Sequence, residues 1–341
     1  MTPRERVYRC LDFATPDRPP QQIWALPIAT QKYPEAWVEL NRRFPSDFGG
    51  PACDPPRSER QRGDQTAIGT YVDAWGCEWT NIQEGVVGEV KRPPLADWAA
   101  LRDLQPPWET VPQRQHLARV NESCAQSDLF VMVGLGTLFE QMQFLRGTAN
   151  LFVDIMERPR EFFALRDMVH QYNLAVARAW LATDVDGVSQ NDDWGTQQAL
   201  LIPPRLWREL FKPCYAELVQ MVRAAGKRFF LHSDGHVFEI YEDLIEIGVD
   251  AVNSQLFCMD IEEIGRRHKG RITFWGEVDR QHVLPSPDPQ VAREAVRRVA
   301  RALYDPRGGV IAQCEFGAGA NPAAVEAVFD EWQRIAAQGG P

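Results

Sequence analysis

From about residue 125 onward, short apolar runs alternate with longer amphipathic stretches. The runs LFVMVGLG, KRFFLHSDG and RITFWGEVD have the length and composition of buried strands. Between such runs lie stretches such as DPQVAREAVRRVARALY, in which apolar residues recur at the spacing of one helix face. Strands that alternate with helices predict βαβ units and a parallel sheet. At least six such units follow one another, so we predict an α/β fold, a closed (β/α)8 TIM barrel.

The first 125 residues follow a different pattern, in which Pro, Gly and Trp interrupt the apolar periodicity. The segment ERVYRCLDF predicts a short amphipathic helix, and QQIWALP predicts a first strand. The segments GTYVDAWGCEWTN and GVVGEVKR together predict a β-ribbon. We therefore expect residues 1–341 to form a single barrel domain, in which residues 30–125 supply a cap and ribbon elaborations.

Composition narrows the range of partners and compartments. The chain has 37 Lys and Arg against 47 Asp and Glu, a net charge of −10, which argues against nucleic acid or an anionic membrane as the main partner. No apolar run reaches the roughly 20 residues of a membrane span. The segment MTPRERVYRC lacks the apolar core of a signal peptide. Seven scattered Cys residues do not suggest a disulfide framework, so we expect a cytoplasmic protein.

Polar residues stand at the end of each predicted strand. Function in parallel barrels concentrates at the carboxyl ends of the strands, so we expect these side chains to converge on one cavity rim. They are Asn191, Asp192 and Asp193; His232 and Asp234; Asn253 and Gln255; Glu277 and Asp279; and Cys314 and Glu315.

His232 and Asp234 are the first candidates for metal binding. Residues two apart in an extended segment point the same way, so the imidazole and the carboxylate would face one site. With Cys314 from a later strand as a third ligand, and Glu277 as a possible fourth, they suit Zn²⁺. The alternative is a histidine that carboxylates hold in a polar pocket without metal.

The pair Asp192 and Asp193 can ligate a cation, accept a proton or hold a substrate group. One of them would instead cap a helix, so we assign one aspartate to each role. Together with Glu277 they are the candidate catalytic residues. The candidate substrate-binding residues are Trp194, Gln197, Asn253, Gln255 and Asp279, although Asp279 also suits an ion pair with Arg280 or another arginine of the barrel rim.

Several segments together resemble the uroporphyrinogen decarboxylase superfamily, in particular its corrinoid-dependent methyltransferases. They are RERVYRCLDFATPDRPP, YVDAWGCEW, DDWGTQQALLIPPRLWRELFKP, LHSDGHVFEIYEDLIEIGVDAVNSQ and FWGEVDRQHVLP. The resemblance runs nearly end to end and implies a (β/α)8 barrel with the active site in its mouth, and barrels of this superfamily often pair, so a homodimer is possible.

The methyltransferase branch binds zinc through a His-x-Cys pair and a distant Cys. In this sequence His232 and Cys314 match that pattern, but Asp234 replaces the middle Cys. A carboxylate ligand makes the ion a harder Lewis acid, which suits oxygen or nitrogen better than sulfur. The resemblance therefore implies zinc-assisted transfer of a methyl group from an O- or N-methylated small molecule. The acceptor would be a reduced corrinoid on a separate protein, because the chain has no D-x-H-x-x-G cobalamin signature.

A second interpretation is a decarboxylase or lyase that acts on a small carboxylate or a porphyrinogen without a cofactor. The decarboxylases of haem synthesis carry an N-terminal segment of the type R-Q-A-G-R-Y-L-P, which holds propionate groups. No such segment follows IWALPIATQKYPEAW, and this absence favours the methyltransferase.

Overall fold

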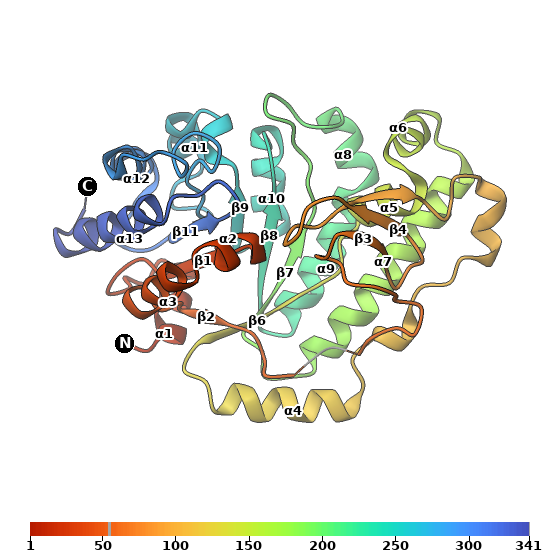
Figure 1. The fold of residues 1–341 in the computed structure, drawn as a ribbon, viewed down its shortest axis with the longest axis horizontal. Helices are drawn as coiled ribbons and strands as arrows, with labels where there is room; N and C mark the ends of the chain where they lie inside the picture. The colour runs from red at the N-terminus through yellow and green to blue at the C-terminus, as the bar shows by residue number, and fades with distance from the viewer. Residues whose placement is uncertain (54–55, 341) are drawn as a thin grey trace.

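The computed structural model describes residues 1–53 and 56–340. Its centre is one sheet of eight strands, all paired in parallel, with helices outside it (Figure 1). The predicted α/β barrel is thereby confirmed. In the order of pairing, the strands are β1 (Gln21–Ala25), β11 (Val310–Phe316), β10 (Thr273–Trp275), β9 (Ala251–Ser254), β8 (Arg228–Ser233), β7 (Gly187–Asn191), β6 (Phe130–Gly134) and β2 (Phe48–Gly49).

The ends of this sheet, β1 and β2, meet at a seam formed by Asp47. The backbone N–H of Asp47 donates to the carbonyl of Gln21 at 3.0 Å, and the N–H of Gln21 donates to the Asp47 carboxylate at 2.7 Å. Arg6 and Arg18 form ion pairs with the same buried carboxylate. These contacts bring the two edge strands together, so the barrel is nearly closed.

Helices cover the outside of the barrel and connect its strands. Several of them begin as sequence rules predict: Asp288 and Asn321 each cap a helix whose first residue is proline. The helices that follow the first strand are α2 (Pro27–Lys32), α3 (Pro34–Arg43), α4 (Arg114–Ala125), α5 (Phe139–Arg146), α6 (Thr148–Glu157), α7 (Arg160–Leu181), α8 (Pro204–Leu210), α9 (Lys212–Ala224), α10 (Tyr241–Ile247), α11 (Ile261–His268), α12 (Pro289–Leu303) and α13 (Pro322–Ala337). Short 3-10 turns lie at η1 (Trp98–Asp103), η2 (Trp108–Thr110), η3 (Phe238–Ile240) and η4 (Leu256–Cys258).

Two apolar clusters show which side of each strand faces inward. The smaller cluster fills the barrel and includes Phe130, Phe230 and Ile311, whereas the larger one packs between the strands and the helices. Because side chains alternate along a strand, neighbours such as Phe229 and Phe230 belong to different clusters. This alternation decides which polar residues reach the mouth.

The N-terminal helix, α1 (Pro3–Leu11), closes the opposite end of the barrel. Its apolar residues Val7, Cys10 and Leu11 belong to the inner cluster. The hydroxyl of Tyr8 donates to Asp186, just before β7, at 3.0 Å. The helix therefore packs beneath the strands as part of the core.

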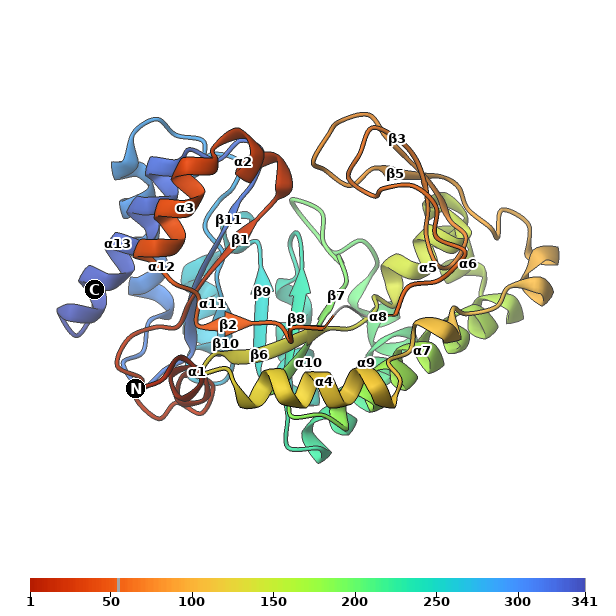
Figure 2. The same ribbon diagram turned by 60° about the horizontal axis from the view of Figure 1, so that its bottom comes forward.

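A three-stranded antiparallel ribbon extends from the barrel: β3 (Gly69–Val72), β4 (Glu78–Asn81) and β5 (Glu89–Arg92). This confirms the predicted ribbon. It lies beside α5 and α6, far from α12 and α13 (Figure 2), and Trp79 packs against Phe144 of α5 at 4.6 Å between ring centroids. Within residues 30–125, α3 and β2 belong to the barrel wall rather than to a cap. In the described residues, no helix combines the length and apolar character that crossing a bilayer requires.

Candidate metal site at the barrel mouth

Three side chains at the ends of β7 and β8 form a group that can hold a metal ion. Asp193, His232 and Asp234 each offer one ligand atom, and these atoms all lie within 4.8 Å of one another. His232 Nε2 is 3.5 Å from Asp193 Oδ1 and 3.6 Å from Asp234 Oδ1. Over residues 1–53 and 56–340, no other group of His, Cys, Asp or Glu side chains meets in this way.

Asn253 fixes the orientation of the His232 ring. Its Oδ1 lies 2.6 Å from His232 Nδ1, while its Nδ2 donates to the carbonyl of Trp275 and to Gln313 Oε1. The amide nitrogen is thus occupied elsewhere, so its oxygen accepts a hydrogen bond from the Nδ1–H group. Nε2 is then the ring nitrogen that faces Asp193 and Asp234, which is the arrangement of a metal-binding histidine.

The two carboxylates are held differently. Asp193 Oδ1 accepts the backbone N–H of Asp234 at 2.8 Å. Burial, followed by the neighbouring charge of Asp234, raises the pKa of Asp193. Asp234 Oδ2 forms an ion pair with Arg280, but Asp234 Oδ1 is buried and has no hydrogen-bond partner. A buried carboxylate oxygen without a partner is costly, and this one faces His232 Nε2.

Arg280 is the cation at the centre of the mouth. Besides Asp234, it pairs with Glu315 at 3.2 Å and approaches Glu277 at 3.8 Å. It therefore connects the candidate metal ligands with the carboxylates at the ends of β10 and β11. Asp279 pairs instead with His282 at 3.1 Å, so the expected ion pair with an arginine is not what the structure shows.

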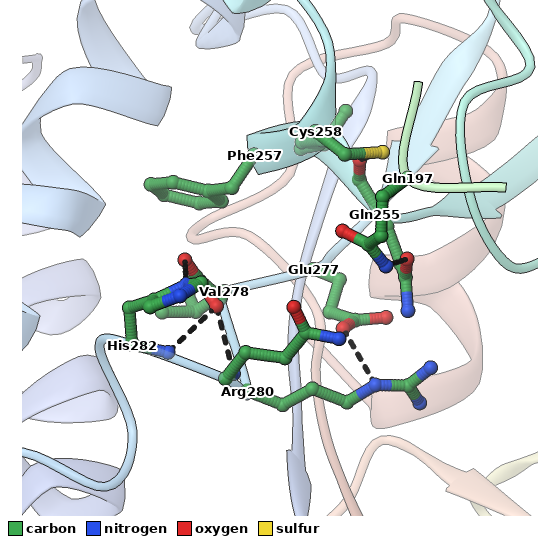
Figure 3. A pocket seen from close by; sticks show the side chains of 11 residues that line it. Gln197, Gln255, Phe257, Cys258, Glu277, Val278, Arg280 and His282 are labelled. Atoms are coloured by element: carbon green, nitrogen blue, oxygen red, sulfur yellow. Dashed lines mark hydrogen bonds and ion pairs between the residues drawn. The ribbon is translucent and has the colours of Figure 1, made fainter. Parts of the chain in front are cut away.

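A small pocket of about 60 Å³ adjoins this network. Four of the predicted site residues line it: Gln197, Gln255, Glu277 and Asp279. Figure 3 shows the Glu277 carboxyl group between the Gln197–Gln255 amide pair and the Arg280 guanidinium. Burial, which Arg280 opposes, raises the pKa of Glu277 to about 8, so this side chain is largely protonated at neutral pH.

Sequence reasoning missed Glu140, in the first turn of α5. Burial, then the charges of Asp193, Asp192 and Asp234, raise its pKa to about 8. The signal was an acidic residue in the first helical turn after the glycine-closed strand LFVMVGLG. Glu140 is therefore a second protonated carboxyl group near the candidate metal ligands.

Cys314 does not join the metal group, which corrects the predicted ligand set. On β11, Gln313 contacts Asn253 inside the barrel and Glu315 contacts Arg280, so Cys314 between them points outward. It is fully buried in the cluster between strands and helices, and this burial raises the pKa of its thiol. Asp193 takes the place that the sequence assigned to Cys314.

The assignment of Asp192 as a catalytic residue also changes. Asp192 is fully buried and accepts hydrogen bonds from the N–H groups of Leu138 and Glu140 and from the Tyr215 hydroxyl, so it caps the start of α5 rather than acting on substrate. The aspartate pair does divide into a cap and a site residue, but the capped helix is the one after β6. Burial raises the pKa of Asp192 to about 6.

Trp194 and Asn253 are also buried and do not contact the pocket. Trp194 stacks on Phe139 with ring centroids 4.0 Å apart and donates to the Tyr215 hydroxyl, so it is a core residue. Asn253 positions His232, as described above, rather than binding substrate directly.

The protein is a parallel (β/α)8 barrel whose carboxylates, imidazole and guanidinium gather at the mouth, where the active sites of TIM-barrel enzymes lie. The sequence model of uroporphyrinogen decarboxylase (URO-D) matches residues 66–335, and the chain belongs to this family. No curated protein matches the sequence.

Solved structures support the fold. A methyltransferase from Methanosarcina mazei superposes with a TM-score of 0.66 at 15% identity, over 98% of this chain and 99% of that one. A Xanthomonas albilineans dihydropteroate synthase reaches a TM-score of 0.34 at 12% identity, over 62% of this chain and 70% of that one. At 15% identity, the similarity to the methyltransferase shows a shared fold.

Proposed function

We propose that this protein is a zinc-dependent methyltransferase that moves a methyl group from an O- or N-methylated small molecule to a corrinoid on a partner protein. The observation that carries the proposal is the buried Asp234 Oδ1, which has no hydrogen-bond partner and lies 3.6 Å from His232 Nε2. These two atoms and the Asp193 carboxylate form the ligand set that we propose for the cation.

The ligand set suits a hard or borderline divalent ion. Two carboxylates balance a charge of +2, and three protein ligands leave a position for substrate. Zn²⁺ bound there would act as a Lewis acid on the heteroatom that carries the methyl group. Without a thiolate ligand, oxygen or nitrogen donors are favoured over sulfur.

The chain's own residues would orient the donor and supply a proton. Gln197 and Gln255 offer amide groups to the small pocket, and Glu277 offers a protonated carboxyl group there. As the methyl group leaves, the heteroatom gains negative charge, and the Glu277 proton is placed to neutralise it. Arg280 then stabilises the carboxylate that remains.

The test combines metal analysis with an acceptor assay. Purified protein is expected to retain about one zinc per chain. With a methyl ether or a methylamine as donor, it is expected to convert cob(I)alamin to methylcobalamin, and the absorbance of the corrinoid measures this conversion. His232→Ala is expected to lose both metal and transfer. Equal activity of metal-free protein would contradict the proposal, as would transfer only from a methyl thioether.

Decarboxylation of a small carboxylate is the second candidate, because Arg280 supplies a guanidinium at the pocket that can pair with such a substrate. Release of CO₂ from small carboxylates by metal-free protein, without methyl transfer, would favour this activity. Arg280→Met would then be expected to abolish CO₂ release, and the zinc content of the protein would not change the rate.

A further inference from the structure

A second and much larger cavity lies under the ribbon, apart from the pocket around Glu277. It holds about 560 Å³, within the range of small-molecule sites. Its walls come from the carboxyl end of β6, from α5 and α7, from the turn between β3 and β4, and from lining residues within 51–53, 56–61 and 107–112. The residues used below are Trp75, Gly134, Leu135, Gln141, Tyr172 and Val176.

The aromatic wall of this cavity is fixed by contacts of its own. Trp75 packs edge-on against Tyr172 with ring centroids 5.1 Å apart. The hydroxyl of Tyr172 shares a hydrogen bond of 2.5 Å with Thr110 Oγ1. Thr110 also lines the cavity, so both rings are held in place by neighbouring residues of the wall, and their apolar surfaces suit a flat apolar molecule.

The cavity offers no free charge to a ligand. Among the described residues that line it, Asp73 is the only charged one. Its carboxylate already accepts hydrogen bonds from the backbone N–H groups of Trp75 and Cys77 and from Trp79 Nε1. An ionic ligand would therefore lose its hydration without gaining a counter-ion.

One donor in the wall is unpaired. Gln141 Nε2 is buried and has no hydrogen-bond partner. An unpaired buried amide donor favours a ligand that presents an acceptor oxygen or nitrogen to it. Gln141 thus adds a single polar preference to an otherwise apolar and aromatic site.

Gly134 leaves room at the floor of the cavity. It is exposed although it ends a central barrel strand, and a Cβ placed on it would meet no atom within 4 Å. A larger residue here would project into open space rather than into the core. This position therefore allows the cavity to be filled by substitution.

We propose that this cavity is a binding site for an uncharged, ring-bearing small molecule that accepts a hydrogen bond from Gln141 Nε2. The site differs in chemistry from the acidic pocket around Glu277, and it does not depend on the candidate metal ligands. Methyl benzoate has the required ring and acceptor, and benzoate is its charged counterpart.

Titration calorimetry of the full chain with these two probes tests the proposal. Methyl benzoate is expected to bind and benzoate to bind far more weakly, with or without EDTA. Gly134→Leu is expected to weaken binding of methyl benzoate by about tenfold or more, because the added side chain fills the space. Gln141→Leu is expected to weaken it about fivefold through loss of one hydrogen bond. Ile82→Ala, at a ribbon residue that is 89% exposed, is the control and should not change binding.

Val176→Phe fills the cavity from α7 and provides a second variant if Gly134→Leu unfolds at a lower temperature. Unchanged binding of methyl benzoate in Gly134→Leu or in a folded Val176→Phe variant would overturn the proposal. Equal affinity for benzoate, or no binding of methyl benzoate by the wild-type chain, would also overturn it. None of these outcomes depends on methyl transfer, so the two proposals fail separately.

Discussion

Asn253 Oδ1 accepts a hydrogen bond from His232 Nδ1 at 2.6 Å, and this contact leaves His232 Nε2 facing Asp193 and Asp234. We predict that Asn253→Ala lowers zinc affinity about 10- to 100-fold, because the ring loses its fixed tautomer and orientation. Competition with a chromogenic chelator measures the affinity. Thermal denaturation must show that the variant folds, since Asn253 also bonds Gln313. Unchanged affinity in a folded variant would contradict the assigned tautomer.

Cys314→Ala is predicted to leave zinc stoichiometry unchanged, because the thiol lies outside the barrel interior. The cost is expected to be about 1 kcal/mol of unfolding free energy from the small cavity left behind. Metal analysis and urea unfolding measure the two effects. Asp193→Ala and Asp234→Ala are the matched variants, and both should lose metal. Loss of zinc from Cys314→Ala would restore the ligand set that the sequence suggested.

Arg280→Met is predicted to tighten divalent-cation binding about tenfold. The substitution removes a positive charge paired with Asp234 and frees the second carboxylate oxygen of that ligand. Calorimetric titration of EDTA-treated protein with zinc measures the change. Weaker binding would instead show that Arg280 is needed to orient Asp234.

Asp192→Ala is predicted to lower the free energy of unfolding by about 2–4 kcal/mol, since it leaves two backbone donors and the Tyr215 hydroxyl unpaired. Tyr215→Phe removes one of these contacts and also the acceptor of the Trp194 indole N–H, and it should cost about 1–2 kcal/mol. Urea unfolding compares the variants. A milder effect of Asp192→Ala than of Tyr215→Phe would contradict the capping role.

Stability is predicted to fall as pH rises through the range set by Glu277. Its pKa is about 8 in the folded chain against 4.5 as the ordinary value, so between these limits the unfolded chain releases a proton that the folded chain retains. The favourable contribution is complete below about pH 4.5 and is lost as pH approaches 8, with a slope of at most about 1.4 kcal/mol per pH unit. Urea unfolding at several pH values in EDTA measures it.

Glu277→Gln is expected to reduce that slope, and Glu140→Gln should act in the same direction because its pKa is also raised to about 8. Glu122→Gln, at an exposed position on α4, is the control. A pH profile that Glu277→Gln leaves unchanged would show that this carboxyl group ionises normally in the folded chain.

The sequence was sufficient to predict the barrel and many of the polar residues at its mouth, because both follow from the periodicity of apolar and polar positions. Short apolar runs between amphipathic helices define a parallel sheet, and strand ends define where polar residues gather. The spacing of His232 and Asp234 placed both on one side of an extended segment, and their nearest atoms are 3.6 Å apart. The ribbon followed from turn residues between short β-rich segments.

Cys314 and Trp194 were misplaced for a physical reason. In the run GGVIAQCEF, alternation places Gln313 and Glu315 on one face and Cys314 on the other, and the pairing register of β11 decides which of these faces points inward. Trp194 follows a strand end, but the packing of its loop against Phe139 is a long-range contact that local pattern does not encode. Glu140 was missed for the same reason, since its neighbours come from β7 and β8.

Helix α1 seals one end of the barrel with Val7, Cys10 and Leu11, which leaves the strand-end opening as the route to His232. For the proposed methyl transfer, a donor molecule and a corrinoid protein must then arrive from the same direction. A docked protein would obstruct entry of the smaller reactant. Under that proposal we expect an ordered reaction, in which the methylated compound enters first and its demethylated product leaves after the protein acceptor has departed.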